Sequence, residues 1–146
     1  MREKCADGIA QALQEVPEGT LAILQNGAQA VRDCHAGDQL TTQIVGKGRI
    51  ERYRLYPGIE ISCHQYLAQE VRFCHRASDT VLEINHCRQG RIGWKMRDGI
   101  SVYLGAGDLC LHTRECCADS EMMLPLGYYE GIDLTVDLER LRGSEP

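Results

Sequence analysis

The sequence predicts a mainly β domain, a sandwich or barrel of short strands that follows one short amphipathic helix. The first observation is a series of β-rich runs after Gly48, separated by turn residues about every 8 to 12 positions. The second is a helical spacing of apolar residues in the N-terminal segment. The third is length: 146 residues, of which 43% are apolar and 25% charged, supply one hydrophobic core and are too few for two.

The helix is expected between residues 4 and 16. Ile9 and Leu13 recur there at helical spacing, and Pro17 closes the segment because proline cannot continue a helix. Residues 20–42 stay open, because "TLAILQNG" fits a strand entering a turn and also a second helix.

Strands account for most of the remaining chain. We expect them at residues 49–56, 59–66, 70–74, 81–87, 92–96, 100–104, 109–113, 121–126 and 132–138. Gly90 and the Asp98–Gly99 pair indicate tight hairpins, since glycine supplies the positive φ that such turns demand. The runs that these turns join should be antiparallel neighbours. In a further turn, "GAGD", the side chain of Asp108 can cap its own backbone.

Charge excludes one class of partner. The net charge is −5, and residues 115–146 carry eight carboxylates against Arg140 and Arg142. Such a surface repels a phosphate backbone, whose neutralisation by Lys and Arg provides most non-specific affinity. We expect no binding of nucleic acid by these residues alone.

The N-terminus indicates the compartment. "MREKCADGIAQALQEV" has no continuous apolar core and no small-residue cleavage site, and no apolar run approaches the length that crosses a bilayer. We expect a cytoplasmic protein without a membrane partner. Its eight cysteines should be free thiols in a reducing compartment.

Three longer stretches carry a family resemblance. They are "GKGRIERYRLYPGIEISCHQY", "LEINHCRQGRIGW…DGISVYLGAGDL" and "SEMMLPLGYYEGIDLTVDLE". Together they resemble the N-terminal cupin-like sensor domain of AraC/XylS-type transcription regulators, over most of residues 46–139. The resemblance implies a double-stranded β-helix, or jelly roll, that binds an effector ahead of a DNA-binding domain with two helix-turn-helix units.

The resemblance also divides the chain. Residues 1–45 form an N-terminal helical or irregular segment that packs on the barrel, residues 46–139 form the cupin-like sensor barrel, and residues 140–146 form a tail or the start of a linker. We expect DNA binding only through a domain that this chain lacks, and we expect a homodimer.

An enzyme is the alternative reading, because metal-dependent cupins resemble the same arrangement. Glu83, seven residues before Gly90, falls where their glutamate ligand would, and His112 lies near the position of another ligand. A catalytic metal needs three or four protein ligands, and the chain has no H-x-H. It also has no G-x-S-x-G elbow and no Walker-type loop. We therefore expect no metal, no cofactor and no catalysis.

Cysteine and histidine are adjacent at four places: Cys34–His35, Cys63–His64, Cys74–His75 and His86–Cys87. A zinc site assembled across strands is one interpretation. Adjacent strand residues point to opposite faces, however, so a pair cannot reach one ion without a bulge. We prefer buried cysteines that act as small apolar residues, with histidines on the surface or in a pocket.

A candidate ligand pocket follows from strand alternation. If Glu83 faces the barrel interior, Asn85 and Cys87 face the same way, whereas Leu82 and Ile84 face outward. The apolar residues expected inside the next strands are Ile92, Trp94, Met96, Val102 and Leu104. Another strand face carries Glu60, Ser62, His64 and Tyr66 and is either solvated or turned into a polar cavity. The candidate ligand-binding residues are Glu83, Asn85, Trp94, His64, Tyr66 and His112.

The sequence thus predicts a regulatory domain that binds an unknown small molecule in a β-barrel and relays this to dimerisation or DNA binding. Its outward surface at Leu82 and Ile84, with the helix through Leu13, is expected to report binding. Two alternatives stay open. One is a metal-dependent cupin enzyme with degenerate ligands, and the other is a dimerisation module with a filled barrel.

Overall fold

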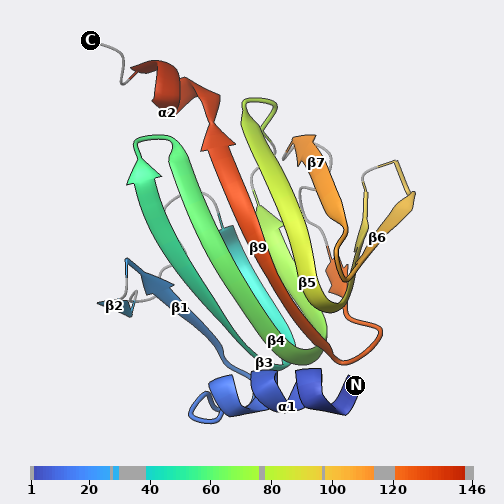
Figure 1. Cartoon of the computed structure of the whole chain (residues 1–146). Coiled ribbons are helices and arrows are strands. Elements are labelled where there is room, and N and C mark those ends of the chain that lie inside the picture. Colours follow the sequence, from blue (N-terminus) through green and yellow to red (C-terminus); the bar gives the residue numbers. More distant parts are fainter. Residues whose placement is uncertain are drawn as a thin grey trace.

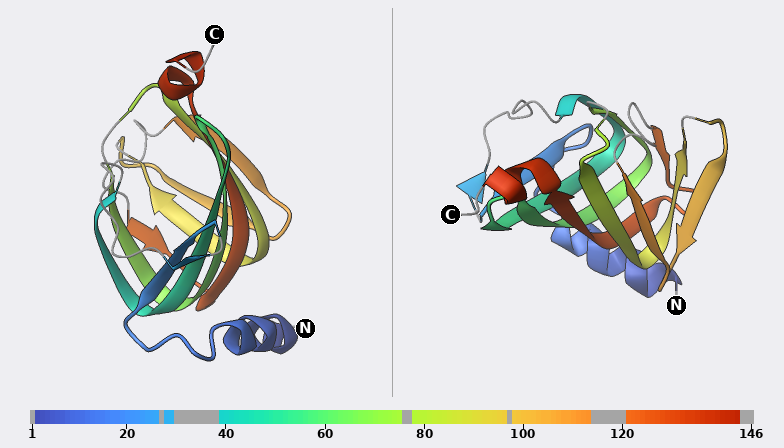
Figure 2. Two further views of the ribbon diagram at one scale, coloured as in Figure 1. Left: turned by 90° about the vertical axis from the view of Figure 1, so that its left-hand side faces the viewer. Right: turned by 90° about the horizontal axis from the view of Figure 1, so that it is seen from above.

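The computed structural model describes residues 2–26, 28–29, 39–75, 78–96, 98–113 and 121–143. They form a strongly bent sheet with one short helix at each end (Figures 1 and 2). In chain order the elements are α1 (Arg2–Ala12), β1 (Leu21–Gln25), β2 (Ala28–Gln29), β3 (Gln39–Tyr56), β4 (Ile59–His75), β5 (Val81–Lys95), β6 (Ser101–Gly105), β7 (Leu109–Thr113), β8 (Glu121–Met123), β9 (Tyr128–Asp137) and α2 (Leu138–Gly143).

Three long strands pass from one wall of the barrel to the other. One half of each of β3, β4 and β5 joins β1, β9 and β7 in what we call the front sheet, which faces the viewer in Figure 1. The other half joins β8 and β6 in the back sheet. The expected mainly β barrel is confirmed, and the interior lies between the two walls (Figure 2).

Two strand boundaries in the sequence prediction were wrong. Residues 59–66 and 70–74 belong to one strand, β4, and residues 81–87 and 92–96 belong to another, β5. Gly90 has the expected positive φ of 83°, but the chain bends there beside a register shift instead of reversing. A Cβ at Gly90 would overlap the carbonyl of Tyr128, so the glycine permits close passage of two strands.

The other turn predictions are confirmed. Asp98–Gly99 joins β5 to its antiparallel neighbour β6, with the backbone N–H of Ile100 donating to Asp98 Oδ1 at 3.0 Å. Asp108 caps the next turn by accepting from the N–H of Gly105 at 2.8 Å. This turn carries the chain from the back sheet to β7 in the front sheet.

Each end of the front sheet carries one short helix. Ile9 of α1 and Leu13, directly after it, pack on Tyr128 at the start of β9, with Leu67 beside them. At the opposite end, the N–H of Asp137 donates to the carbonyl of Gly58 and the N–H of Leu138 to that of Thr80, which seats α2 on two strand connections.

The open segment 20–42 is partly settled. It contains β1, which pairs in parallel with β3, and the short strand β2, whereas residues 30–38 lie outside the described part. Within the described ranges, no helix is both long and apolar enough to span a membrane.

Candidate functional site

Strand β5 brings its polar side chains into the barrel. Asn85 and Cys87 are 2% and 0% exposed, whereas Leu82 and Ile84 on the other face keep intermediate exposure. The predicted orientation of this strand is therefore confirmed. Past the bend at Gly90, Ile92 takes up the interior face and belongs to the apolar core with Trp94 and Leu104.

The polar face of β4 also looks inward. Ser62 is 6% and Tyr66 0% exposed, so the face that also carries Glu60 and His64 lines the interior and not the solvent. Strand β9 lies between β4 and β5, with Asp133 opposite both Ser62 and Asn85. Three neighbouring strands thus turn polar groups into one space.

A chain of polar contacts joins these strands. His64 Nε2 lies 3.0 Å from Asp133 Oδ2, and His64 Nδ1 lies 2.6 Å from the hydroxyl of Tyr66. Because a carboxylate only accepts, Nε2 donates to Asp133. The side chain of Asn85 donates to Asp133 from the other side.

The series of polar contacts continues into β7. His112 Nε2 donates to Asn85 Oδ1 at 2.8 Å and lies 3.8 Å from Glu83 Oε2. Its ring meets the indole of Trp94 edge-on, with centroids 6.2 Å apart. All six residues predicted from the sequence therefore lie in or beside one interior network, which we call the polar chain: Glu83, His112, Asn85, Asp133, His64 and Tyr66, with Trp94 against it.

Electrostatics keep the centre of the polar chain charged. Burial alone would raise the pKa of Asp133, but the charge of His64 and the hydrogen bonds from His64 and Asn85 hold that pKa below its ordinary value. His112 adds a further favourable charge. Asp133 is thus the fixed anion around which the two histidines are organised.

Asp133 was missed by the sequence analysis. Its strand alternates Gly131, Asp133 and Thr135 with Ile132 and Leu134, which is the same signal that marked Glu83 and Asn85. The signal was available, but alternation does not state which set points inward. Asp133 is recognised only when β9 is placed between β4 and β5.

The described thiols are held in the protonated form. Burial, and after it the charge of Asp108, raises the pKa of Cys87 to about 11. Burial also raises the pKa of Cys63 and of Cys110, in Cys63 with help from the charge of Glu51. A thiol is a poor nucleophile and metal ligand, because the thiolate is the reactive form.

The adjacent Cys–His pairs separate as expected where the structure describes them. Cys63 and His64 point to opposite faces of β4, and His86 and Cys87 do so on β5. The pair at 34–35 lies outside the described residues, as do the side chains at 74–75. Among the side chains that are described, no three His, Cys, Asp or Glu residues converge on a possible metal position.

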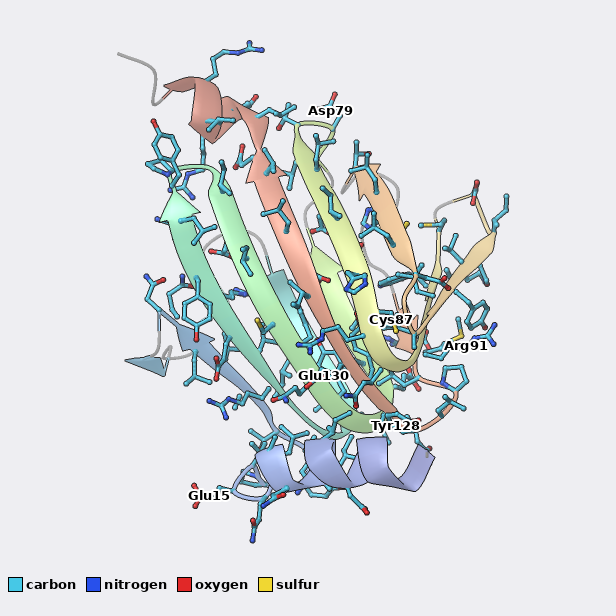
Figure 3. All side chains as sticks on the ribbon, in the orientation of Figure 1. Glu15, Asp79, Cys87, Arg91, Tyr128 and Glu130 are labelled. Carbon is cyan, nitrogen blue, oxygen red and sulfur yellow. The ribbon has the colours of Figure 1, made fainter. Side chains whose placement is uncertain are left out.

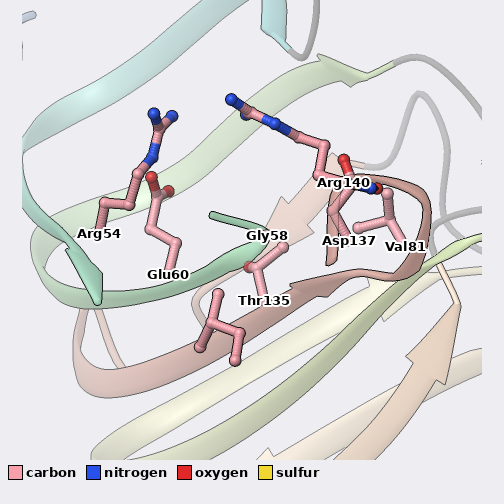
Figure 4. A pocket seen from close by; sticks show the side chains of 8 residues that line it. Arg54, Gly58, Glu60, Val81, Thr135, Asp137 and Arg140 are labelled. Carbon is pink, nitrogen blue, oxygen red and sulfur yellow. The ribbon is translucent and has the colours of Figure 1, made fainter. Parts of the chain in front are cut away.

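A small cavity opens at the α2 end of the front sheet. It has a volume of about 70 Å³, and Figure 4 shows its lining. The residues around it are Arg54, Gly58, Ile59, Glu60, Val81, Thr135, Asp137 and Arg140. Glu60, Thr135 and Glu83 occupy directly opposed positions on three neighbouring strands, so the cavity and the polar chain meet on one wall.

Comparison with known proteins identifies the fold. A Cupin 2 conserved barrel domain protein from Salinispora arenicola has a TM-score of 0.51 and 16% sequence identity, over 66% of this chain and 81% of that one. A cupin protein from Bacteroides fragilis has a TM-score of 0.46 and 20% identity, over 62% and 72% of the two chains. An HTH_3 family transcriptional regulator from Vibrio cholerae has a TM-score of 0.45 and 14% identity, over 60% of this chain and 50% of its own length.

No protein-family model and no curated protein matches the sequence. The protein is therefore defined by its fold: it is a mainly β, cupin-type barrel with short helices at its ends.

Proposed function

We propose that this barrel is the effector-sensing domain of an AraC-type transcription regulator and binds a small polar or amphipathic molecule without chemical change. The observation that carries the proposal is the polar chain inside the barrel. Buried and half-buried polar groups contribute little net stability compared with apolar packing, so six of them on four strands are better explained by a ligand than by folding.

The position of Glu83 supports ligand binding at one end of the polar chain. Its side chain keeps 17% exposure, whereas that of the neighbouring His112 keeps 7%. An effector that enters from the α2 end meets Glu83 before it meets Asn85. Trp94 provides a flat apolar surface on the far side of His112.

The proposal of binding without covalent catalysis is supported at three cysteines. Cys63, Cys87 and Cys110 have raised pKa values, which disfavour a thiolate nucleophile among them. The three quoted stretches that resemble AraC/XylS-type sensor domains support a regulatory role, in which binding is relayed to a helix-turn-helix domain.

The test is a titration with a panel of small polar metabolites. Binding is monitored through the fluorescence of Trp94, the only tryptophan. An effector should shift this fluorescence and raise the melting temperature, because it binds only the folded state. Glu83→Ala should weaken binding tenfold or more, since a lost hydrogen-bonding partner is worth about 1 to 3 kcal/mol.

Glu70→Ala is the matched control, because Glu70 is a carboxylate on β4 that pairs with Arg72 outside the barrel. It should bind the effector as the wild type does. Unchanged binding by Glu83→Ala would place the site elsewhere. If no compound shifts fluorescence or melting, the filled-barrel alternative is correct.

A further inference from the structure

The cavity at the α2 end of the front sheet has a lining of balanced charge. It contains two guanidinium groups, from Arg54 and Arg140, and two carboxylates, from Glu60 and Asp137. In Figure 4 the side chain of Arg140 extends toward Arg54, and both guanidinium groups lie on the same side of the cavity. Two like charges that converge on one space repel each other and favour an anion between them. The cavity therefore offers a place for an anionic group.

Glu60 adds a second requirement. Arg54 and Glu60 are directly opposed on β3 and β4, where Cβ atoms normally lie about 4.5 to 5.5 Å apart. Within the described part of the chain, however, the two side chains form no ion pair with each other. Glu60 is partly buried, and a carboxylate withdrawn from water needs a cationic or hydrogen-bonding partner. Glu60 would repel a ligand that is only an anion, whereas a ligand that also carries an ammonium group provides that partner.

Backbone contacts hold α2 beside this cavity. The N–H of Asp137 donates to the carbonyl of Gly58 at 2.7 Å, and Asp137 Oδ1 accepts from the backbone N–H of Arg140 at 3.2 Å. Gly58 has a φ of 93°, and a Cβ there would lie 2.8 Å from the backbone nitrogen of Leu141. The close approach of this turn to α2 places Arg140 at the cavity.

The N-terminal helix lies at the other end of the front sheet. Leu13 packs on Tyr128, and Figure 3 labels Tyr128 and Asp79 at opposite ends of this sheet. Leu82 is opposite Val136, close to the start of α2. The expectation that the helix through Leu13 lies with Leu82 and Ile84 is therefore wrong.

The cavity has the size of a ligand head group. Its volume of about 70 Å³ is about twice the roughly 30 Å³ that one water molecule occupies in the liquid. A pocket that encloses a whole drug-sized ligand measures about 300 to 1,000 Å³. Thr135 and Glu83 follow Glu60 on the next two strands, so a larger ligand continues from the cavity along the polar chain.

We propose that the effector is a small α-amino acid, whose carboxylate lies between Arg54 and Arg140 and whose ammonium group faces Glu60. This inference rests on the function proposed above, because it names the class of effector for the same barrel. A guanidinium group matches a carboxylate through two parallel N–H···O bonds, which an ammonium side chain cannot form. A polar side chain on the ligand then lies against Thr135 and Glu83.

The test is isothermal titration calorimetry of the whole chain with the common α-amino acids at up to about 10 mM, which is about ten times a millimolar Kd. At least one amino acid should bind. Two analogues of the tightest-binding amino acid are then compared with it, one without the amino group and one with an amide in place of the carboxylate. Each should bind at least tenfold more weakly, because each lacks one charge-assisted interaction.

Arg54→Gln should lower the affinity for the amino acid at least tenfold. It should not weaken binding of the amide analogue further, because the interaction with the carboxylate is already absent there. Arg54 is exposed, so the variant without ligand should melt at the wild-type temperature. Arg91→Gln is the matched control, because Arg91 is also exposed and lies over the ring of Tyr103, away from α2 in Figure 3. It should bind the amino acid with wild-type affinity.

The proposal is overturned if no amino acid binds at about 10 mM, or if Arg54→Gln binds the amino acid as the wild type does. A neutral metabolite whose binding requires Glu83 and not Arg54 would leave the sensing function in place and overturn only the amino-acid class. Amino-acid binding that requires Arg54 and not Glu83 would support the cavity as the site and remove the polar chain from it.

Discussion

The two walls of this barrel follow opposite rules. In the back sheet, Ile92 and Trp94 face inward while Arg91 and Lys95 face solvent, as in an ordinary soluble barrel. In the front sheet, Asp133 and Asn85 face inward while Leu134 and Ile84 face outward. Both walls contribute to the apolar core, to which the front sheet adds Ile50, Tyr66 and Cys87, but the polar side chains that face inward are concentrated in the front sheet.

The contrast is visible along one strand. Before Gly90, strand β5 points Glu83 and Asn85 into the barrel. After Gly90, it points Ile92 and Trp94 inward. The bend at Gly90 moves the strand from the front sheet to the back sheet. One strand thus contributes to the polar chain with its first half and to the apolar core with its second.

The largest expected effect is a cavity in the back wall. Ile92→Ala should lower the free energy of unfolding by about 2 to 5 kcal/mol, because Ile92 is 2% exposed and its methyl groups leave a void. Ile84→Ala makes the same change on the outward side of the same strand and should cost less than half as much. Urea unfolding of dilute protein measures both, and equal losses would end the distinction between the walls.

The next effect concerns Asp133, the half-buried carboxylate of the polar chain. Asp133→Asn should lower the free energy of unfolding at pH 7 by about 1 to 3 kcal/mol, because His64 loses a charged partner. The pKa of Asp133 is lower in the folded state than in the unfolded state. At pH values near these two pKa values, the unfolded state therefore binds more protons than the folded state. Its stabilising contribution is therefore complete above the ordinary aspartate pKa of about 3.9 and is lost as the pH falls further.

Urea unfolding of both proteins over a pH series measures this contribution. The difference between wild type and Asp133→Asn should shrink as the pH falls below about 4. If the difference in free energy of unfolding stays constant at the lowest pH values, Asp133 stabilises the fold through packing and not through its charge.

The smallest effect is expected on the outward side of the back sheet. Lys95→Ala should change the free energy of unfolding by less than about 0.5 kcal/mol, since Lys95 is exposed on the solvent side. Urea unfolding measures this change, and a larger loss would show that this side of the back sheet is not simply solvated.

Much of the site was accessible from sequence. The alternation around Glu83 and Asn85 predicted which side of their strand points inward, and His64, Tyr66, Trp94 and His112 lie in or beside the same network. The turns at Asp98–Gly99 and Asp108 were predicted because their chemistry is local. Such signals depend on neighbours in the chain and need no knowledge of the fold.

Other features required the assembled sheet. The sequence of β9 determines that Asp133 and Leu134 point to opposite sides, but the same alternation fits either face as the interior. The turn signal at Gly90 likewise determines a positive φ without determining whether the strand reverses or bends. Only pairing with β4 and β5 turns Asp133 inward and Leu134 outward, because partners distant in sequence decide which side is enclosed.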